Sequence, residues 1–392
     1  MPEKNLLVIS NNFPNQDNSY DNIFVKEQIK FLKVYFDNVF VISPVAYGLD
    51  RLRKTSYRNY QYDNVKVFFP KYLNFPFLYY VGRSLWVYLG VKAIGSLIKK
   101  ENLTFDLIHA HFTWPSGAVA VELKNEYKVP VIITEHTSAT FHKAVRNNDA
   151  FWKNTLNTAD AIIRVRKGDI ALFENMNVKK EKIHVIPNGF DAEKFFPMPS
   201  SQCRNELGLP GDIKILLNVG NLYDPIKGHT FFIEAIGRMV KTRQDILGII
   251  VGSGYLEKQL RELIEELQLS PYIRLVGSKP HPEIPLWMNA CDIFVLPSLN
   301  EGNPTVMFEA LGCGKPFIGT RVGGVPEVII SDEYGLLVQP ADSGELAEKI
   351  LSALDRKWDQ ARILEYSERF TWEYIAKEIM SVYKQVLGRT CD

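Results

Sequence analysis

Cysteine is scarce in this sequence, and so are motifs that hold metal ions. The four cysteines, Cys203, Cys291, Cys313 and Cys391, form no close pair. A zinc site or a disulfide framework requires tighter spacing, so we expect reduced thiols of the kind found in a cytoplasm. No Asp-x-Asp motif occurs either. A metal ion held between two such carboxylates is therefore not expected.

Long apolar runs and low-complexity segments are also missing. The first residues lack the apolar region of a signal peptide, and the chain is predicted to be cytoplasmic. Residues 75–98 are rich in apolar side chains, but Arg83 and Lys92 interrupt them. These two charges argue against a membrane-spanning helix.

The composition is that of a globular protein with two domains. The chain has 392 residues, of which 46% are hydrophobic and 23% charged, and one ordinary core does not extend over such a length. Residues 1–200 hold 26 Lys and Arg against 19 Asp and Glu (26 − 19 = +7), and the remainder holds 20 against 26 (20 − 26 = −6). The asymmetry indicates an anionic partner for the first half and a neutral or small ligand for the second.

Short apolar runs alternate with helical patterns along the whole chain, which predicts an α/β fold. Most runs are solidly apolar, as expected for parallel strands covered on both faces, and their repetition predicts doubly wound, Rossmann-like sheets. A Pro- and Ser-rich segment over residues 196–212 predicts the break between two domains, whose strands would end at a common cleft. The predicted strands are 6–10, 39–43, 65–69, 107–110, 131–134, 161–165 and 183–186, then 213–219, 247–251, 273–276, 293–296 and 316–319.

The segment 297–330 carries the densest chemical signal. Asn303 is predicted to cap a helix whose first residue is Pro304 and which runs to about residue 312. The free amides of Thr305 and Val306 would then form an anion site suited to a diphosphate.

Two glutamates flank this turn. Glu301 precedes the predicted helix and Glu309 lies inside it. Carboxylates accept hydrogen bonds at two oxygens and suit paired hydroxyl groups. One could reach towards a sugar and the other towards a ribose. Spacing alone also allows both to be solvated surface residues.

Taken together, these motifs resemble those of the family 4 glycosyltransferases, which are retaining enzymes of the GT-B fold with a glutamate-x7-glutamate signature. The stretch NEGNPTVMFEALGCGKPFIGTRVGGVPEVI is similar to that signature. The similarity extends over essentially the whole chain through FVKEQIKFL, HAHFTWPSG, VIITEH, VIPNGFDAEKF, VGNLYDPIKGH, VGSGYLEKQL, ACDIFVLPS and FTWEYIAKEI. The resemblance implies a glycosyltransferase with an acceptor-binding domain over residues 1–200, a donor-binding domain over 201–370 and a helix over 371–392 that returns to the first domain.

The resemblance also implies roles for single residues. Glu301 would bind the donor sugar hydroxyls, Lys227 the leaving phosphate, and His111 the sugar near its reacting carbon. On the donor side, Glu309 would bind the ribose, and the amides of Thr305 and Val306 would bind the diphosphate. Asn303 would lie on the donor side as well. The glycines Gly252 and Gly254 would either admit the nucleotide or pack closely, and His136 would line the acceptor side.

The sequence departs from the family pattern at two places. Asn22, which the resemblance assigns to the acceptor side, stands near a usual glycine in the loop after the first strand. Asn221, assigned to donor binding, stands where many relatives carry an arginine. The missing charge puts phosphate binding there in doubt, and Arg321 is a candidate to supply it. No metal or separate cofactor is implied, because lysine and amides would stabilise the departing nucleoside diphosphate.

The acceptor is predicted to be a glycan or a lipid-linked hydroxyl, in polysaccharide or glycoconjugate synthesis. Residues 51–100 combine ten basic residues with many aromatic ones and a single acid, Asp63. This composition fits a segment that binds the anionic inner face of a membrane. It fits equally an aromatic core helix whose basic residues form a solvated rim. Nucleic acid is not an expected partner, since no binding module backs the basic residues. The alternatives are a nucleotide-sugar epimerase of the same fold and a non-catalytic sugar-nucleotide binding protein.

Overall fold

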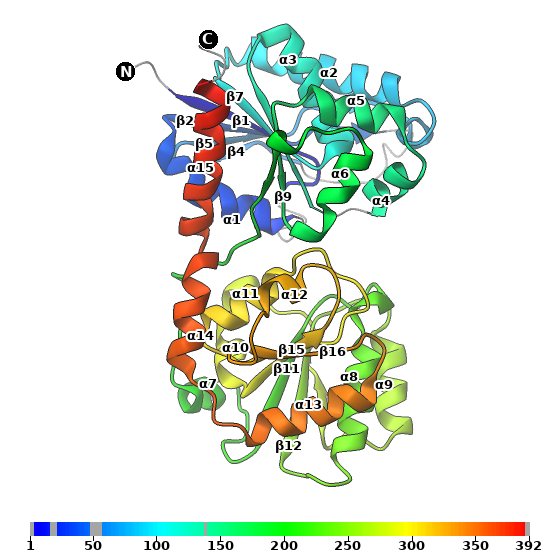
Figure 1. Ribbon diagram of the computed structural model, residues 1–392, viewed down its shortest axis with the longest axis vertical. Coiled ribbons are helices and arrows are strands. Elements are labelled where there is room, and N and C mark those ends of the chain that lie inside the picture. Colours follow the sequence, from blue (N-terminus) through cyan, green and yellow to red (C-terminus); the bar gives the residue numbers. More distant parts are fainter. Residues whose placement is uncertain (1–3, 16–21, 48–56, 137–138, 389–392) are drawn as a thin grey trace. The chain divides into compact units, whose positions relative to one another are not determined.

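The computed structural model describes residues 4–15, 22–47, 57–136 and 139–388. Contacts divide the chain into two compact units (Figure 1). Unit 1 comprises Met1–Pro187 and Ile375–Asp392, and unit 2 comprises Asn188–Tyr374.

Unit 1 is built on an eight-stranded sheet with the order β10-β9-β8-β7-β1-β2-β5-β4. Neighbouring strands are parallel except for the β4–β5 pair. The strands are β1 (Asn5–Ser10), β2 (Asn38–Ile42), β4 (Tyr60–Tyr62), β5 (Val65–Phe68), β7 (Leu107–His111), β8 (Val131–Glu135), β9 (Ala161–Arg164) and β10 (Ile183–Val185). A separate two-stranded sheet pairs β3 (Val45–Tyr47) with β6 (Lys71–Leu73).

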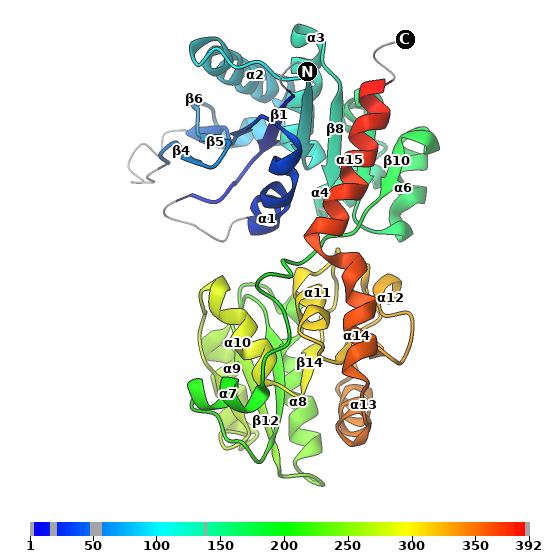
Figure 2. The same ribbon diagram turned by 90° about the vertical axis from the view of Figure 1, so that its left-hand side faces the viewer.

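Helices cover both faces of this sheet (Figure 2). They are α1 (Ile23–Leu32), α2 (Arg83–Lys100), α3 (Ala118–Tyr127), α4 (Ala139–Arg146), α5 (Ala150–Thr158) and α6 (Ile170–Asn175), with a 3-10 turn, η2 (Pro76–Tyr79), before α2. Alternate side chains of one strand point to opposite faces. Ile108 and Ala110 of β7 pack in one buried cluster with α2, α3 and α5, so His109 between them faces the other side.

The last helix, α15 (Trp372–Gly388), lies on that other side of the unit 1 sheet from Ile375 onward. The Tyr383 hydroxyl lies 2.6 Å from Nδ1 of His109, and both side chains are fully buried. The sequence predicts one amphipathic face for this helix, and its six predicted members, Trp372, Ile375, Ile379, Val382, Tyr383 and Val386, are all buried. The amphipathic pattern is thereby confirmed.

Unit 2 contains a six-stranded parallel sheet with the order β13-β12-β11-β14-β15-β16. Its strands are β11 (Lys214–Val219), β12 (Ile246–Val251), β13 (Ile273–Leu275), β14 (Ile293–Leu296), β15 (Phe317–Thr320) and β16 (Gly335–Val338). Its helices are α7 (Ser200–Glu206), α8 (His229–Met239), α9 (Glu257–Glu266), α10 (Ile284–Ala290), α11 (Thr305–Gly312), α12 (Val325–Val328), α13 (Ser343–Asp355) and α14 (Gln360–Ser367).

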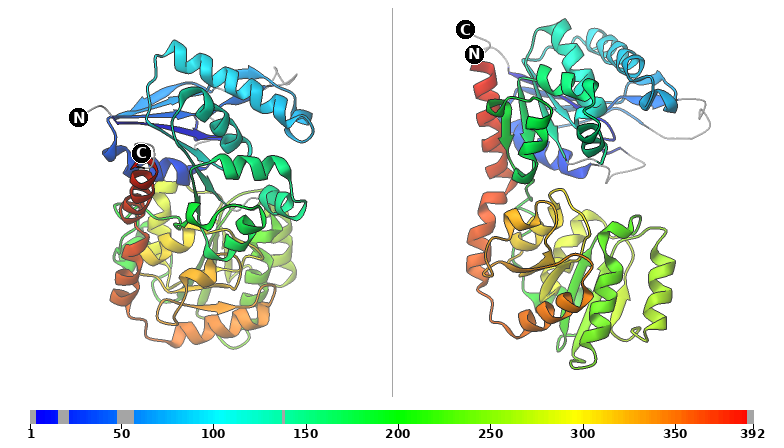
Figure 3. Two further views of the ribbon diagram at one scale, coloured as in Figure 1. Left: turned by 45° about the horizontal axis from the view of Figure 1, so that its top comes forward. Right: turned by 45° about the vertical axis from the view of Figure 1, so that its right-hand side comes forward.

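Helices cover both faces of the unit 2 sheet (Figure 3), and a cluster of buried side chains lies on each face. One joins Ile215 and Leu217 of β11 to α7, α10, α11 and α14. The other joins Leu216 of the same strand to α8, α9 and α13. Strands buried on both faces read as continuous apolar runs, and the sequence predicted twelve of the strands nearly to the residue. The short strands β3, β4, β6 and β16 were missed.

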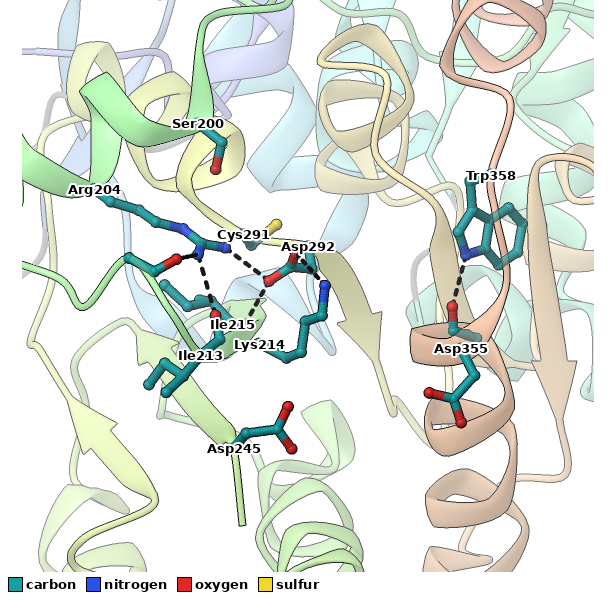
Figure 4. Close-up of polar contacts among 12 residues, drawn as sticks. Ser200, Arg204, Ile213, Lys214, Ile215, Asp245, Cys291, Asp292, Asp355 and Trp358 are labelled. Atoms are coloured by element: carbon teal, nitrogen blue, oxygen red, sulfur yellow. Dashed lines mark hydrogen bonds and ion pairs between the residues drawn. The ribbon is translucent and has the colours of Figure 1, made fainter. Parts of the chain in front are cut away.

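A partly buried ionic network ties the beginnings of β11 and β14 to helix α7 (Figure 4). Oδ2 of Asp292 accepts hydrogen bonds from Arg204 Nη2 and from the Ile215 amide, each at 2.7 Å. Arg204 also donates to the carbonyls of Ala290, Gly211 and Ile213 at 2.9 to 3.1 Å. The segment 196–212, where the sequence predicts the domain break, lies inside unit 2, and contacts divide the chain between residues 187 and 188.

None of the helices within the described ranges is long and apolar enough to cross a membrane. Three of the cysteines, Cys203, Cys291 and Cys313, are buried free thiols. Cys391 lies outside the described residues.

Candidate active site

Helix α11 begins where β14 ends, after a turn that contains Glu301 and Asn303. The prediction that Asn303 caps this helix is wrong. Its Oδ1 instead accepts a hydrogen bond from the Asn188 amide at 2.7 Å, and Asn188 Nδ2 donates to the Asn303 carbonyl at 2.8 Å. Pro304 occupies the cap position with φ −70° and ψ 120°, and the helix starts at Thr305, one residue later than predicted.

This start leaves the amides of Thr305 and Val306 without an acceptor inside the helix, because the first N–H groups have no preceding turn to donate to. Both residues are only half-buried. The helix dipole adds partial positive charge at the same point. The start of α11 therefore has the character of an anion site.

Glu301 and Lys227 meet in front of this turn. Glu301 Oε1 accepts hydrogen bonds from Lys227 Nζ at 2.9 Å and from Ser298 Oγ at 2.7 Å. The glutamate is only 7% exposed, so the alternative that it is a solvated surface residue is wrong. A buried carboxylate with a cation bound to it is a typical constellation of functional sites.

The loop that carries Lys227 is fastened to the loop that carries Glu301. The Leu299 amide donates to the Ile226 carbonyl at 2.7 Å. Gly228 has φ 71°, and a Cβ placed there would lie 1.9 Å from the Pro297 carbonyl oxygen. Glycine is required at this position both for its backbone conformation and for the close approach of the two loops.

Glu309 lies on the second turn of α11 and is also buried, with 6% of its surface exposed. The solvated alternative is wrong for this residue too. Its Oε1 lies 3.2 Å from Nε2 of His281, a residue that sequence reasoning missed. The signal was the position of His281 in the loop that follows β13, at the edge of the sheet where the other candidate residues lie.

Asn221 follows the carboxyl end of β11, and the glycines Gly252 and Gly254 follow β12. A Cβ at Gly252 would lie 1.8 Å from the Gly220 oxygen, and one at Gly254 would lie 2.2 Å from the Leu222 carbonyl carbon. The two glycines thus let two loops pack against each other, which was one of the two predicted roles. The exposed Asn221 accepts a hydrogen bond from the Tyr223 amide at 3.3 Å, so its side chain shapes its own loop. Arg321, the candidate for the missing charge, follows β15 and is exposed.

His229, which sequence reasoning also missed, supports the Asn221 loop. It is buried, and its Nε2 lies 3.0 Å from the Asn221 carbonyl oxygen while its Nδ1 lies 2.8 Å from Asn218 Oδ1. Burial lowers the pKa of His229 below its ordinary value. Because its two ring nitrogens are engaged, we interpret His229 as a structural residue.

In unit 1, His111 and His136 form a pair at the carboxyl ends of β7 and β8. His111 Nδ1 lies 2.9 Å from His136 Nε2, and the rings are nearly parallel. Burial lowers the pKa of His136 to about 3 and that of His111 well below its ordinary value. Both imidazoles are therefore neutral at pH 7, so one donates and the other accepts in the hydrogen bond between them.

The outer nitrogens of this pair, His111 Nε2 and His136 Nδ1, are buried and have no hydrogen-bond partner among the described residues. Because each neutral ring carries one proton, one outer nitrogen is a donor and the other an acceptor. The pair can therefore offer a substrate either kind of hydrogen bond.

Asn22 occupies the N-cap position of α1 with φ 46°, a left-handed conformation that asparagine tolerates better than most residues. This conformation explains how asparagine replaces the usual glycine. Its Nδ2 donates to the Asn11 carbonyl at 3.0 Å. The neighbouring residues 16–21 of the same loop lie outside the described residues.

Asn22 lines a cavity of about 440 Å³ at the carboxyl ends of β1, β2 and β7. The walls carry the amide side chains of Asn11, Asn12 and Asn22 and five aromatic rings, those of Tyr57, Tyr79, Trp86, Phe112 and Trp114. None of the described side chains that line it carries a charge. His136 contacts this wall through the ring of Phe112, at a centroid distance of 5.0 Å.

No group of three or more His, Cys, Asp or Glu side chains in the described part of the chain is placed to hold a metal ion.

Known structures define the fold class. Sucrose-phosphate synthase from Thermosynechococcus elongatus aligns over 98% of this chain and 100% of its own, with a TM-score of 0.79 and 22% identity. HepE from Anabaena, in complex with UDP, aligns over 97% and 100%, with a TM-score of 0.74 and 22% identity. The chain therefore has the GT-B fold of glycosyltransferases.

The sequences define the family. The family described as Glycosyltransferase Family 4 matches residues 38–194, and that described as Glycosyl transferases group 1 matches residues 200–370. An uncharacterised glycosyltransferase from Methanocaldococcus jannaschii is 33% identical over 74% of this chain and 78% of its own. The D-inositol 3-phosphate glycosyltransferase of Corynebacterium glutamicum is 28% identical over 75% of each chain. This chain belongs to glycosyltransferase family 4 and is an enzyme that transfers sugars.

Proposed function

We propose that this glycosyltransferase moves a sugar from a nucleoside diphosphate sugar to a hydroxyl group of a glycan or lipid-linked acceptor, with retention at the anomeric carbon. Such a reaction belongs to the synthesis of a polysaccharide or glycoconjugate. The observation that carries the proposal is the contact between Lys227 and the buried Glu301 beside the free amides of α11. It brings a cation, a carboxylate and an anion site together in unit 2.

The donor-binding roles follow from charge and hydrogen-bonding capacity. The diphosphate binds the amides of Thr305 and Val306 and the ammonium of Lys227. Glu309 accepts hydrogen bonds from the ribose hydroxyls, and Glu301 accepts them from the sugar that is transferred. The structures of HepE with UDP and with UDP-glucose support a nucleotide-sugar donor for this fold.

The leaving group departs with negative charge, which Lys227 and the two amides stabilise. The proposal therefore includes no metal ion and no separate cofactor. In the transfer, the bond from the anomeric carbon to the phosphate oxygen breaks and a bond to the acceptor oxygen forms on the same face. The acceptor proton passes to the departing diphosphate. His111, neutral at pH 7, hydrogen-bonds to the transferred sugar.

The cavity of unit 1 is the proposed acceptor site. Aromatic rings stack on the apolar faces of sugar rings, and asparagine amides both donate and accept hydrogen bonds. An uncharged saccharide fits such a wall better than an anionic group, and nucleic acid is not among the proposed partners. His136 supports this wall through Phe112.

A thermal-shift screen with UDP, GDP and ADP tests the donor site, because a ligand that binds only the folded protein raises its melting temperature. We expect one of them to raise the melting temperature of the wild type and to have a much smaller effect on Glu309→Gln. NMR of the product from the matching donor sugar then tests retention, and an inverted linkage would refute it. Conversion of the donor in the absence of any acceptor would instead indicate an epimerase, and binding without turnover a non-catalytic protein.

A further inference from the structure

Exposed apolar side chains of unit 1 gather on one short segment. Of the 17 large hydrophobic side chains that are exposed among the described residues, seven lie between positions 73 and 88, on β6, η2, the start of α2 and the residues that connect them. We call this set the apolar patch: Leu73, Phe75, Phe77, Tyr80, Val81, Leu85 and Tyr88. Exposed apolar residues that occur singly need no explanation, whereas a contiguous group marks an interaction surface.

The segment is anchored so that these side chains stay outward. Leu78 and Trp86 are each only 7% exposed and belong to the core of unit 1. The backbone between them is turned back on itself, because the amides of Tyr80 and Val81 both donate to the Phe77 carbonyl at 3.1 Å. As a result Phe77, Tyr80 and Val81 are 62%, 75% and 86% exposed. The patch is therefore a built surface on an ordered turn.

Within the stretch of sequence that carries the patch, the charge has one sign. Residues 64–100 contain six basic residues and no acidic one. Lys71 and Lys92 are exposed, and Lys92 Nζ lies 5.6 Å from the centre of the Tyr88 ring. The earlier basic residues Arg51, Arg53 and Lys54 lie outside the described residues. Apolar and aromatic side chains with cations beside them are typical of proteins that bind the interface of an anionic bilayer.

A second cavity, of about 240 Å³, adjoins the patch. Tyr80, Arg83 and the exposed Lys143 of α4 line it. Arg83 is paired with Asp149 at 2.9 Å. The walls of this cavity also include Tyr79 and Trp114, which line the larger cavity as well. The patch is thus continuous with the proposed acceptor site.

We propose that the apolar patch docks on an anionic lipid bilayer, with Phe77, Tyr80 and Val81 in the headgroup region. The two cavities then receive an acceptor that is carried by a lipid, whose anionic group lies near Lys143. The docking itself stands on the patch and its charge, and only the delivery of the acceptor rests on the proposed function. Since α2 does not qualify as a membrane span, the contact is peripheral.

Co-sedimentation with vesicles tests the docking. The probes are vesicles of phosphatidylcholine alone and of phosphatidylcholine mixed with phosphatidylglycerol, at low salt. We expect wild-type protein to bind the anionic vesicles, and the variant Phe77→Ser/Val81→Ser to bind them at least about tenfold more weakly, since a loss of about two methylene equivalents of buried apolar surface is enough for that. Val34→Ser is the matched control, because Val34 is 71% exposed but lies in a different segment. It should bind like the wild type.

Three outcomes would overturn the proposal: no binding of the wild type to anionic vesicles, equal binding of the patch variant, or an equal loss in the control. Self-association of the wild-type protein in solution that is lost in the patch variant would also overturn the proposal, because it would assign the surface to a second copy of the chain. The thermal shift produced by the nucleoside diphosphate is measured on each variant. It should be unchanged, so that a failure of docking is distinguished from a failure of the proposed donor site.

Discussion

Lys227 Nζ lies 2.9 Å from Glu301 Oε1, although 74 positions separate the two residues in the chain. The carboxylate is buried and bound on the same oxygen by Ser298. An ion pair held in this way keeps a cation beside the turn that precedes α11 before any substrate arrives. Pre-positioned charge of this kind stabilises a leaving group without reorganisation during the reaction.

Replacing Lys227 by Ala should lower kcat by about 100-fold to 1,000-fold, in the range found when one preorganised charge donor is removed from an active site. Steady-state kinetics with the donor found in the thermal-shift screen measures this effect. Lys214→Ala is the control, because Lys214 begins the same strand, β11, at its opposite end and pairs with Asp292 at 3.6 Å. A comparable loss in both variants would contradict the role of Lys227.

Glu309→Gln should weaken donor binding by about tenfold or more, because a hydrogen bond to a charged group contributes about 1.5 to 3 kcal/mol. The effect should be in Kd rather than in kcat, since the ribose lies away from the reacting carbon. Isothermal titration calorimetry with the nucleoside diphosphate measures it. Glu348→Gln, a change at an exposed position of α13, should bind like the wild type. Full affinity in Glu309→Gln would remove this residue from the donor site.

Gly228→Ala should destabilise unit 2 by about 1 to 3 kcal/mol and lower activity, because an L side chain is strained at φ 71° and its Cβ would meet the Pro297 oxygen. The displaced loop carries Lys227, so the kinetic loss should resemble that of Lys227→Ala. Urea denaturation measures the stability. Gly211→Ala is the matched control, since a Cβ there has open space around it. A Gly228→Ala variant as stable and active as the control would show that the loop contact is dispensable.

The buried His109 predicts an acid-sensitive fold. Burial lowers its pKa to about 3, whereas the unfolded chain has a histidine pKa of about 6.5. The unfolded state therefore binds the proton first. The stabilisation that the neutral His109 contributes to the folded state is fully present above pH 6.5. It is lost as the pH falls towards 3, by about 1.4 kcal/mol per pH unit.

Urea denaturation of the wild type and of His109→Gln at pH 7 and pH 5 checks this slope. The difference in unfolding free energy between pH 7 and pH 5 should be smaller in the variant by about 2 kcal/mol. Tyr383→Phe serves as a partner test. It leaves a ring nitrogen of His109 without its partner, so it should cost about 1 to 3 kcal/mol at pH 7. Equal pH slopes in wild type and His109→Gln would refute the assignment.

The sequence predicted the strands well because both sheets are covered by helices on their two faces, so most strands are solid apolar runs. The edge strand β16, Gly335–Val338, was missed because it is a run of only four residues that begins with a glycine. The predicted cap of α11 was wrong because a tertiary contact holds Asn303 elsewhere. Asn303 is hydrogen-bonded to Asn188, which lies 115 positions away in the chain. Local propensity contains no information about such a partner.

The candidate site was predicted in part. Spacing brought Glu301 and Glu309 to the same turn, but only the structure shows that both are buried. His281 was missed because its position after β13 is a weak signal by itself, and its contact with Glu309 depends on how the chain after β13 packs. The pairing of His111 with His136 follows from the parallel register of β7 and β8, which the sequence does not specify.

The most direct test of the account is a crystal structure with the nucleoside diphosphate that gives the largest thermal shift. The diphosphate should lie on the amides of Thr305 and Val306 beside Lys227, with the ribose hydroxyls hydrogen-bonded to Glu309. A nucleotide bound in unit 1, with the start of α11 empty, would contradict it.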